Sequence, residues 1–135
     1  MRIEAKTGVI KVSRNDMVDL MSAVLQGIGY WIAWMEAVDR KLLGKSECVE
    51  DYVASGGAER IWISEPFEEK DGKPVETYDI TIDVLKRGLA LWLDGGYDRY
   101  KAYDRETGRI DFCDVDADMA DIIVQCGLFG DVVFG

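Results

Sequence analysis

Residues 9–28 read VIKVSRNDMVDLMSAVLQGI and contain a strand, a helix start and an apolar helical stripe in direct succession. Val9–Val12 predicts a short strand. Ser13, with Asp16 three residues later, predicts an N-cap of the capping-box type. The apolar residues that follow recur at the spacing of one helix face: Met17, Leu20, Met21, Val24, Leu25 and Ile28. This stretch therefore predicts a fold that combines strands with amphipathic helices.

Further helices and strands alternate along the rest of the chain. Thr81 and Asp116 predict the N-caps of two more amphipathic helices. A short helix is expected over 46–54, with Ser46 as its cap. The aromatic segment Tyr30–Val38 suits a strand covered on both faces or a buried helix, and the strand is favoured. Four further strands are predicted at residues 59–64, 75–80, 97–103 and 109–113.

The chain is expected to form a single globular domain, residues 1–135, of the α+β class. We expect about three helices to pack on one face of a small antiparallel sheet. The reason is that the strands come as hairpins and not as a regular series of strand, helix and strand. Apolar residues make up 48% of the chain, which is enough to build a core.

The composition also predicts where the protein acts. No apolar run approaches the roughly 18 residues of a membrane-spanning helix, so no membrane partner is expected. Met1–Lys6 lacks the apolar stretch of a signal peptide. The three cysteines are an odd number, which predicts free thiols in the reducing cytoplasm. Cys113 is expected to be a buried structural thiol.

The net charge of −10 is unevenly distributed along the chain. Residues 46–83 carry three basic and eleven acidic side chains, and residues 111–135 carry six aspartates and no Lys or Arg. Such a chain repels nucleic acid and attracts basic protein surfaces, although acidity also keeps a small protein in solution. The candidate acidic surface consists of Glu65, Glu68, Glu69, Asp71, Asp111, Asp114 and Asp118.

Few residues are candidates for catalysis. The chain has no histidine, which excludes serine–histidine and cysteine–histidine catalysis and two-histidine zinc sites. Asp114, Asp116 and Asp118 have the D-x-D-x-D spacing of a weak metal candidate. However, Met119 stands where a calcium loop needs glycine, and Gln125 where it needs glutamate. A helix cap at Asp116 is therefore favoured, and no catalytic residue, cofactor or metal is expected.

A mixed aromatic and basic segment follows the second amphipathic helix. It is the candidate site for a ligand or a partner, and it comprises Tyr97, Arg99, Tyr100, Lys101, Tyr103, Arg105 and Arg109. Such a mixture can stack a nucleotide base and hold its phosphates. Tyr and Arg are also enriched where proteins bind one another. The same pattern is more often typical of core packing or of an ordinary amphipathic strand.

The C-terminal pattern DxDAxxADxIxQxxLFGDxVFG, residues 114–135, occurs together with Gly29-Tyr30-Trp31 after the first helix. With these residues the chain resembles a group of short, acidic, uncharacterised proteins from phages and prophages of anaerobic gut bacteria. The resemblance implies an accessory protein of a mobile element in a bacterial cytoplasm. It implies no functional residues, because that group has no established activity.

Two functions are compatible with this setting. The first is a non-catalytic protein whose acidic surface binds a basic host protein, for example a defence component, and modulates or inhibits it. The second is a protein that binds or sequesters a nucleotide through the segment from Tyr97 to Arg109. The apolar residues Phe129–Phe134 are expected either in the monomer's core or at the interface of a homo-oligomer.

Overall fold

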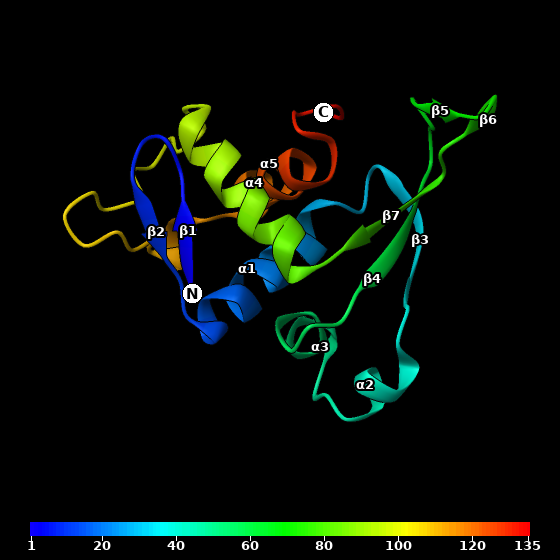
Figure 1. Cartoon of the computed structure of the whole chain (residues 1–135), viewed down its shortest axis with the longest axis horizontal. Coiled ribbons are helices and arrows are strands. Elements are labelled where there is room, and N and C mark those ends of the chain that lie inside the picture. Colours follow the sequence, from blue (N-terminus) through cyan, green and yellow to red (C-terminus); the bar gives the residue numbers. More distant parts are fainter.

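The computed structural model describes all residues from Met1 to Gly135 and has the predicted α+β architecture (Figure 1). The helices are α1 (Arg14–Gly27), α2 (Arg40–Gly44), α3 (Val49–Ala54), α4 (Ile82–Asp94) and α5 (Ala117–Phe129), with a 3-10 turn η1 (Phe112–Asp114). The strands are β1 (Arg2–Glu4), β2 (Val9–Lys11), β3 (Ile32–Ala37), β4 (Glu59–Ile63), β5 (Glu69–Lys70), β6 (Lys73–Pro74) and β7 (Thr77–Ile80).

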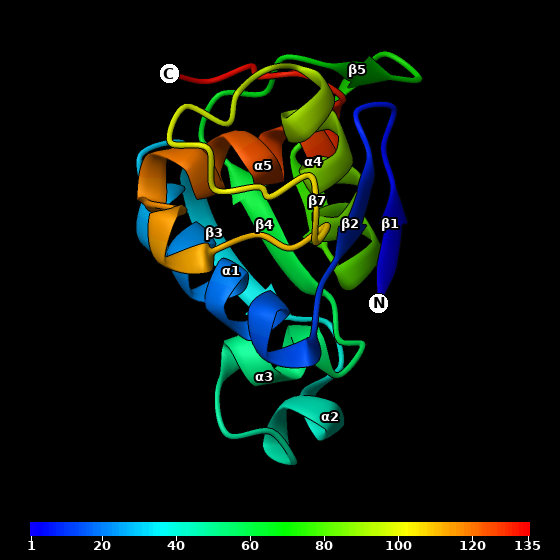
Figure 2. The ribbon, with the colours of Figure 1, turned by 90° about the vertical axis from the view of Figure 1, so that its left-hand side faces the viewer.

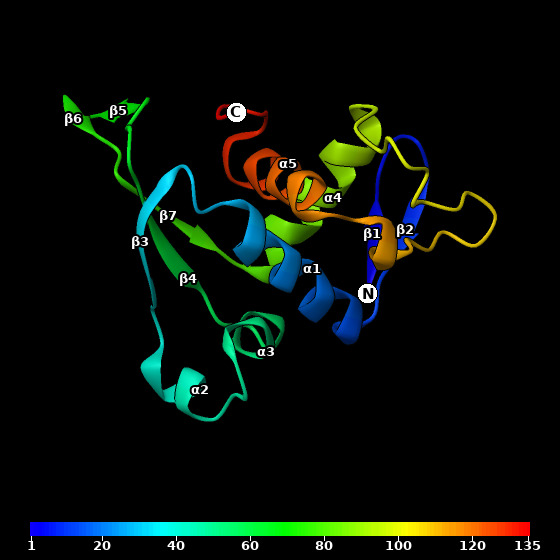
Figure 3. The same cartoon turned by 180° about the vertical axis from the view of Figure 1, so that it is seen from behind.

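The strands form three small antiparallel sheets around the three long helices. The largest has the order β3-β4-β7, and β1-β2 and β5-β6 are separate hairpins. Figure 1 and the reverse view in Figure 3 place α1, α4 and α5 between the β1-β2 hairpin and the three-stranded sheet. Ile61 and Ile63 of β4 are buried, whereas Arg60 and Trp62 on the opposite face are partly exposed. The helices therefore cover one face of this sheet.

Helix α5 lies at the centre of the fold and packs against both α1 and α4. Gly88 of α4 and Gly127 of α5 face each other's helix so closely that a Cβ on either would overlap a backbone carbonyl oxygen of the partner helix. Gly27 of α1 meets the carbonyl of Ala117 in the same way. These three glycines let the helix backbones approach one another closely. This close approach helps to pack a core of 25 buried residues.

The predicted N-caps of the three long helices are confirmed. Ser13 accepts a hydrogen bond from the Asp16 N–H, and the Asp16 side chain accepts one from the Ser13 N–H, which completes the capping box. Thr81 caps α4 and Asp116 caps α5. These local signals hold because each cap satisfies N–H groups that the first helical turn leaves free.

The prediction of strands at 97–103 and 109–113 is wrong. Residues 97–111 form a loop with only two isolated bridges, Tyr103 with Ile110 and Lys11 with Arg109, and Phe112 and Cys113 begin the turn η1. The physical reason is that the Asp98 carboxylate accepts the N–H groups of Ala102 and Tyr103, which a strand would need for its ladder. Figure 2 shows this loop, in yellow, running towards the β1-β2 hairpin.

The middle of the chain also departs from the predictions. Strand β3 exists, but it is an edge strand with Trp34 62% exposed, so it is not covered on both faces. Ser46 does not cap α3. Its hydroxyl donates to the Leu42 carbonyl and closes helix α2, which the sequence analysis did not predict.

Two expectations about single side chains have opposite outcomes. Cys113 is exposed in η1, so the prediction of a buried thiol is wrong, because the short turn holds it at the surface. Phe134 stacks on Trp31 with ring centroids 5.1 Å apart, which places the C-terminal apolar segment against the monomer's own core. No helix in the structure has the length and apolar character needed to cross a membrane.

Candidate functional site

The two acidic segments lie apart in space. Glu65, Glu68, Glu69 and Asp71 are exposed on and beside the β5-β6 hairpin, which projects from the three-stranded sheet (Figure 1). The exposed carboxylates at η1 and the start of α5 lie on the other side of the helices (Figure 3): Asp111, Asp114 and Asp118. None of these seven side chains takes part in an ion pair. The acidic candidates therefore form two surfaces and not one.

Two side chains of the aspartate run accept hydrogen bonds from backbone N–H groups. Asp116 accepts the N–H of Met119 at 2.8 Å and caps α5, and Asp111 accepts the N–H of Cys113 at 3.0 Å. Asp114 is exposed, and no three Asp, Glu or Cys side chains converge in a metal-ligand arrangement. This arrangement agrees with the helix-cap interpretation of Asp116.

The structure divides the predicted aromatic and basic segment into two groups. Arg99, Tyr100 and Lys101 are exposed in the loop after α4, and Tyr97 packs beside Gly95 at the end of that helix. These four residues do not line the groove described next. Tyr103, Arg105 and Arg109 instead reach the β1-β2 hairpin at the opposite end of the loop.

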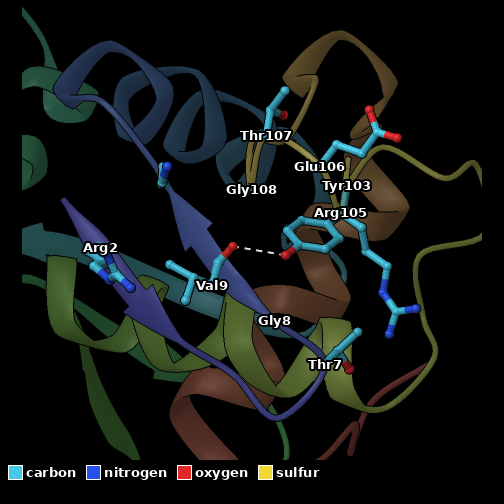
Figure 4. Close-up of a pocket in the computed structure, with 10 residues that line it drawn as sticks. Arg2, Thr7, Gly8, Val9, Tyr103, Arg105, Glu106, Thr107 and Gly108 are labelled. Atoms are coloured by element: carbon cyan, nitrogen blue, oxygen red, sulfur yellow. Dashed lines mark hydrogen bonds between the residues drawn. The ribbon is translucent and has the colours of Figure 1, made fainter.

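A groove lies between the β1-β2 hairpin and residues 103–109, with a volume of about 490 Å³. Tyr103 joins its two walls, because its hydroxyl donates to the Val9 carbonyl at 2.8 Å (Figure 4). The N–H of Lys11 also donates to the Gly108 carbonyl at 2.7 Å. Figure 4 shows Arg2 and Arg105 on opposite sides of the Tyr103 ring. The groove is therefore an open, elongated hollow with fixed walls.

Three cations, Arg2, Lys11 and Arg105, and one acid, Glu106, line this hollow. A second hollow of about 520 Å³ adjoins it, shares Arg2 and Lys11, and adds Arg109. We call the surface formed by Arg2, Lys11, Arg105 and Arg109 the basic groove. Arg2 pairs with Glu4 at 3.2 Å, whereas the other three cations form no ion pair. Because the remaining surface is strongly acidic, these cations form a local region suited to anions.

Sequence reasoning missed Arg2 and Lys11, which are half of the basic groove. They are directly opposite each other in the β1-β2 pair, so the hairpin brings both to one surface. One sequence feature could have indicated this hairpin: Thr7-Gly8 is a turn signal between two short segments that contain apolar residues. Contact of this hairpin with residues 103–109 has no local signal, because it depends on tertiary packing.

The exposed thiols are poorly suited to nucleophilic chemistry. A hydrogen bond to Glu50 raises the pKa of Cys48, and the charge of Asp111 raises the pKa of Cys113. Burial raises the pKa of the Cys126 thiol to about 11. All three thiols therefore stay protonated at neutral pH, whereas a reactive cysteine needs a lowered pKa.

Comparison of this chain with protein-family models, with curated proteins and with solved structures finds no match. The site is therefore interpreted from its own geometry and charge.

Proposed function

We propose that this chain is a non-catalytic binding protein that holds a polyvalent anion, such as a nucleotide with several phosphates, in the basic groove. The observation that carries the proposal is the presence of Lys11, Arg105 and Arg109 without ion-pair partners on one surface of a chain with net charge −10. Unpaired cations gathered on one surface attract a polyanion and form charge-assisted hydrogen bonds with its oxygens.

The spacing of the cations favours an extended ligand over a single phosphate. Arg2 and Arg105 lie on opposite sides of the Tyr103–Val9 contact (Figure 4), and an anion with several phosphates can engage both sides. The Tyr103 hydroxyl is engaged with Val9, and its ring is half-buried. Recognition is therefore assigned to the charges and not to stacking of a base on this ring.

Isothermal titration calorimetry with a nucleoside triphosphate, pyrophosphate and orthophosphate tests this proposal. We expect the two polyanions to bind more tightly than orthophosphate, and we expect their affinity to fall as the salt concentration rises. Arg105→Ala and Lys11→Ala should each weaken binding by roughly threefold to tenfold, because each removes one charge-assisted contact. Lys73→Ala on the distant β5-β6 hairpin is the matched control. Absence of binding at millimolar ligand, or an equal loss in the control, contradicts the proposal.

A second candidate function is modulation of a basic host protein through the projecting acidic hairpin. It is supported by the four exposed carboxylates Glu65, Glu68, Glu69 and Asp71, none of which is neutralised by an ion pair. It also suits the bacterial setting that the C-terminal resemblance implies. Capture from a bacterial lysate should retain a basic protein on the natural chain, and the Glu68→Gln/Glu69→Gln double variant should release it. Equal retention by both forms contradicts this function.

A further inference from the structure

We infer that the hollow between Tyr30, Trp31 and Phe134 is a binding site for an organic cation, a guanidinium or alkylammonium group. This site is separate from the basic groove and has the opposite charge preference. It is lined by the residues just before β3, by those just after β4 and by the C-terminal segment, whereas the basic groove lies at the β1-β2 hairpin.

The hollow is lined by three aromatic residues and one carboxylate, Glu65. Its volume is about 290 Å³, and Ser64, Glu65 and Gly135 complete its lining. The Trp31 and Phe134 rings are stacked at 5.1 Å with an angle of 10° between their planes, so each covers one face of the other. Tyr30 also lines the hollow, and 59% of its surface is exposed. The mostly exposed Tyr30 ring is therefore the main aromatic surface open to a ligand. Aromatic rings carry negative charge on their faces, which attracts a cation placed near them.

A buried carboxylate lies directly behind these aromatic walls. Asp121 is 7% exposed and accepts hydrogen bonds from the Tyr30 hydroxyl at 2.5 Å and the Trp31 Nε1–H at 2.8 Å. It also accepts one from the Gln125 Nε2–H at 2.9 Å. All three donors are uncharged, and no Lys or Arg pairs with Asp121.

Burial of an anion without a counter-charge is costly, and neutral donors compensate it only in part. Tyr30 and Trp31 both donate a hydrogen bond to Asp121 and both line the hollow. The negative charge of Asp121 therefore lies one side chain away from the hollow and makes its electrostatic potential more negative. The behaviour of Tyr30 agrees with this field, because burial and then Asp121 raise its pKa to about 12. Tyr30 therefore remains neutral, and the lining holds no cation that would oppose a cationic guest.

The wall at Phe134 is fixed before any ligand arrives. The Gln125 Oε1 accepts the N–H groups of Val133 and Phe134, each at 2.8 Å. The Gln125 Nε2 donates to the Phe134 carbonyl at 3.2 Å as well as to Asp121. One buried side chain thus joins the aromatic wall to the carboxylate. A preformed wall lowers the entropy that binding must overcome.

The geometry favours an organic cation over a metal ion. Both oxygens of Asp121 already accept hydrogen bonds, Oδ2 from Tyr30 and Oδ1 from Trp31 and Gln125. A hard metal ion needs several free oxygen ligands, and no group of carboxylates supplies them here. A guanidinium or alkylammonium group instead gains from the exposed Tyr30 ring, from the nearby Asp121 carboxylate and from the Glu65 carboxylate in the lining.

Two-dimensional NMR of the full chain tests the inference through the Trp31 indole N–H signal, which is assigned by its absence in Trp31→Phe. The probes are ethylguanidinium, tetramethylammonium and the uncharged isostere tert-butanol. We expect saturable shifts with the cations and none with the alcohol. Asp121→Asn should weaken cation binding roughly tenfold, and Asp83→Asn, an exposed acid on α4, should leave it unchanged.

If Asp121→Asn does not fold, Tyr30→Leu provides the second variant, because Tyr30 is mostly exposed, and it should weaken binding by a similar factor. A short arginine-containing peptide distinguishes the two sources of the cation. Binding tighter than ethylguanidinium indicates a protein side chain, and equal binding indicates a small molecule. Absence of saturation at 100 mM, about the limit for a useful site, overturns the inference, as does an equal response to tert-butanol. Neither result affects pyrophosphate binding at the basic groove, which tests the other site.

Discussion

The substitution Gly88→Ala tests whether the α4–α5 contact sets the architecture. A Cβ at residue 88 would overlap the Ile123 carbonyl oxygen, which belongs to a helix backbone and cannot move aside like a side chain. Alanine in an open helical site is favoured over glycine by about 1 kcal/mol. Overpacking of a rigid contact costs up to about 3 kcal/mol, so a net loss of about 2 kcal/mol in the free energy of unfolding is expected.

That loss converts into a measurable change in melting temperature. For a chain of 135 residues the entropy of unfolding is about 0.28 kcal/mol/K, so Gly88→Ala should lower Tm by about 7 °C. Thermal unfolding followed by circular dichroism measures the change. Gly44→Ala is the matched control, because Gly44 ends α2 and a Cβ there meets no atom within 4 Å. It should leave Tm unchanged or raise it slightly. If Gly88→Ala behaves like this control, the close helix contact is refuted.

Three further substitutions test other parts of the fold. Burial raises the pKa of Glu59, so its ionisation opposes folding, and stability is lost as pH rises from 4.5 through the raised pKa. Glu59→Gln should therefore have a larger free energy of unfolding than the natural chain when both are unfolded with urea at pH 7. If this difference between the two chains stays constant down to pH 4, about the ordinary pKa of a glutamate, the reasoning is contradicted. Gln125→Ala removes the acceptor of two backbone N–H groups and should cost about 2 kcal/mol. Hydrogen exchange at Val133 and Phe134 should accelerate, and unchanged exchange argues against the bonds. Ser13→Ala should cost about 1 kcal/mol by removing the cap of α1, and an unchanged Tm would show that the cap adds no stability.

Local signals in the sequence predicted the elements that local physics controls. Ser13, Thr81 and Asp116 cap the long helices because each side chain reaches a backbone N–H only three residues away. The apolar stripe of α1 was equally visible, because a helix buries one face at a fixed spacing. The fold class follows from these elements, and it is confirmed.

The candidate sites were less accessible to sequence reasoning, because they depend on contacts between distant segments. Lys11 and Arg109 are separated by 97 residues and meet only after α1, α4 and α5 have packed. Asp98 also captures N–H groups that the alternating pattern of 97–103 assigned to a strand. Summing the charges of consecutive residues missed the basic groove for the same reason. Its four cations come from two segments that are far apart in the sequence, and each sum also includes neighbouring acidic residues.

The C-terminal pattern and the residues after α1 have a shared structural role. Tyr30 and Trp31 bond Asp121, and Gln125 links Asp121 to Phe134, so the two quoted pieces of sequence meet in one hydrogen-bond network. Three donors use both oxygens of Asp121, whereas an amide at this position would offer only one acceptor oxygen. The carboxylate therefore has a structural role in this network, while its burial without a paired Lys or Arg leaves room for a cationic ligand. For this reason Asp121→Asn separates the two roles: stability retained with cation binding lost would assign the charge to recognition, and loss of both would assign it to the fold.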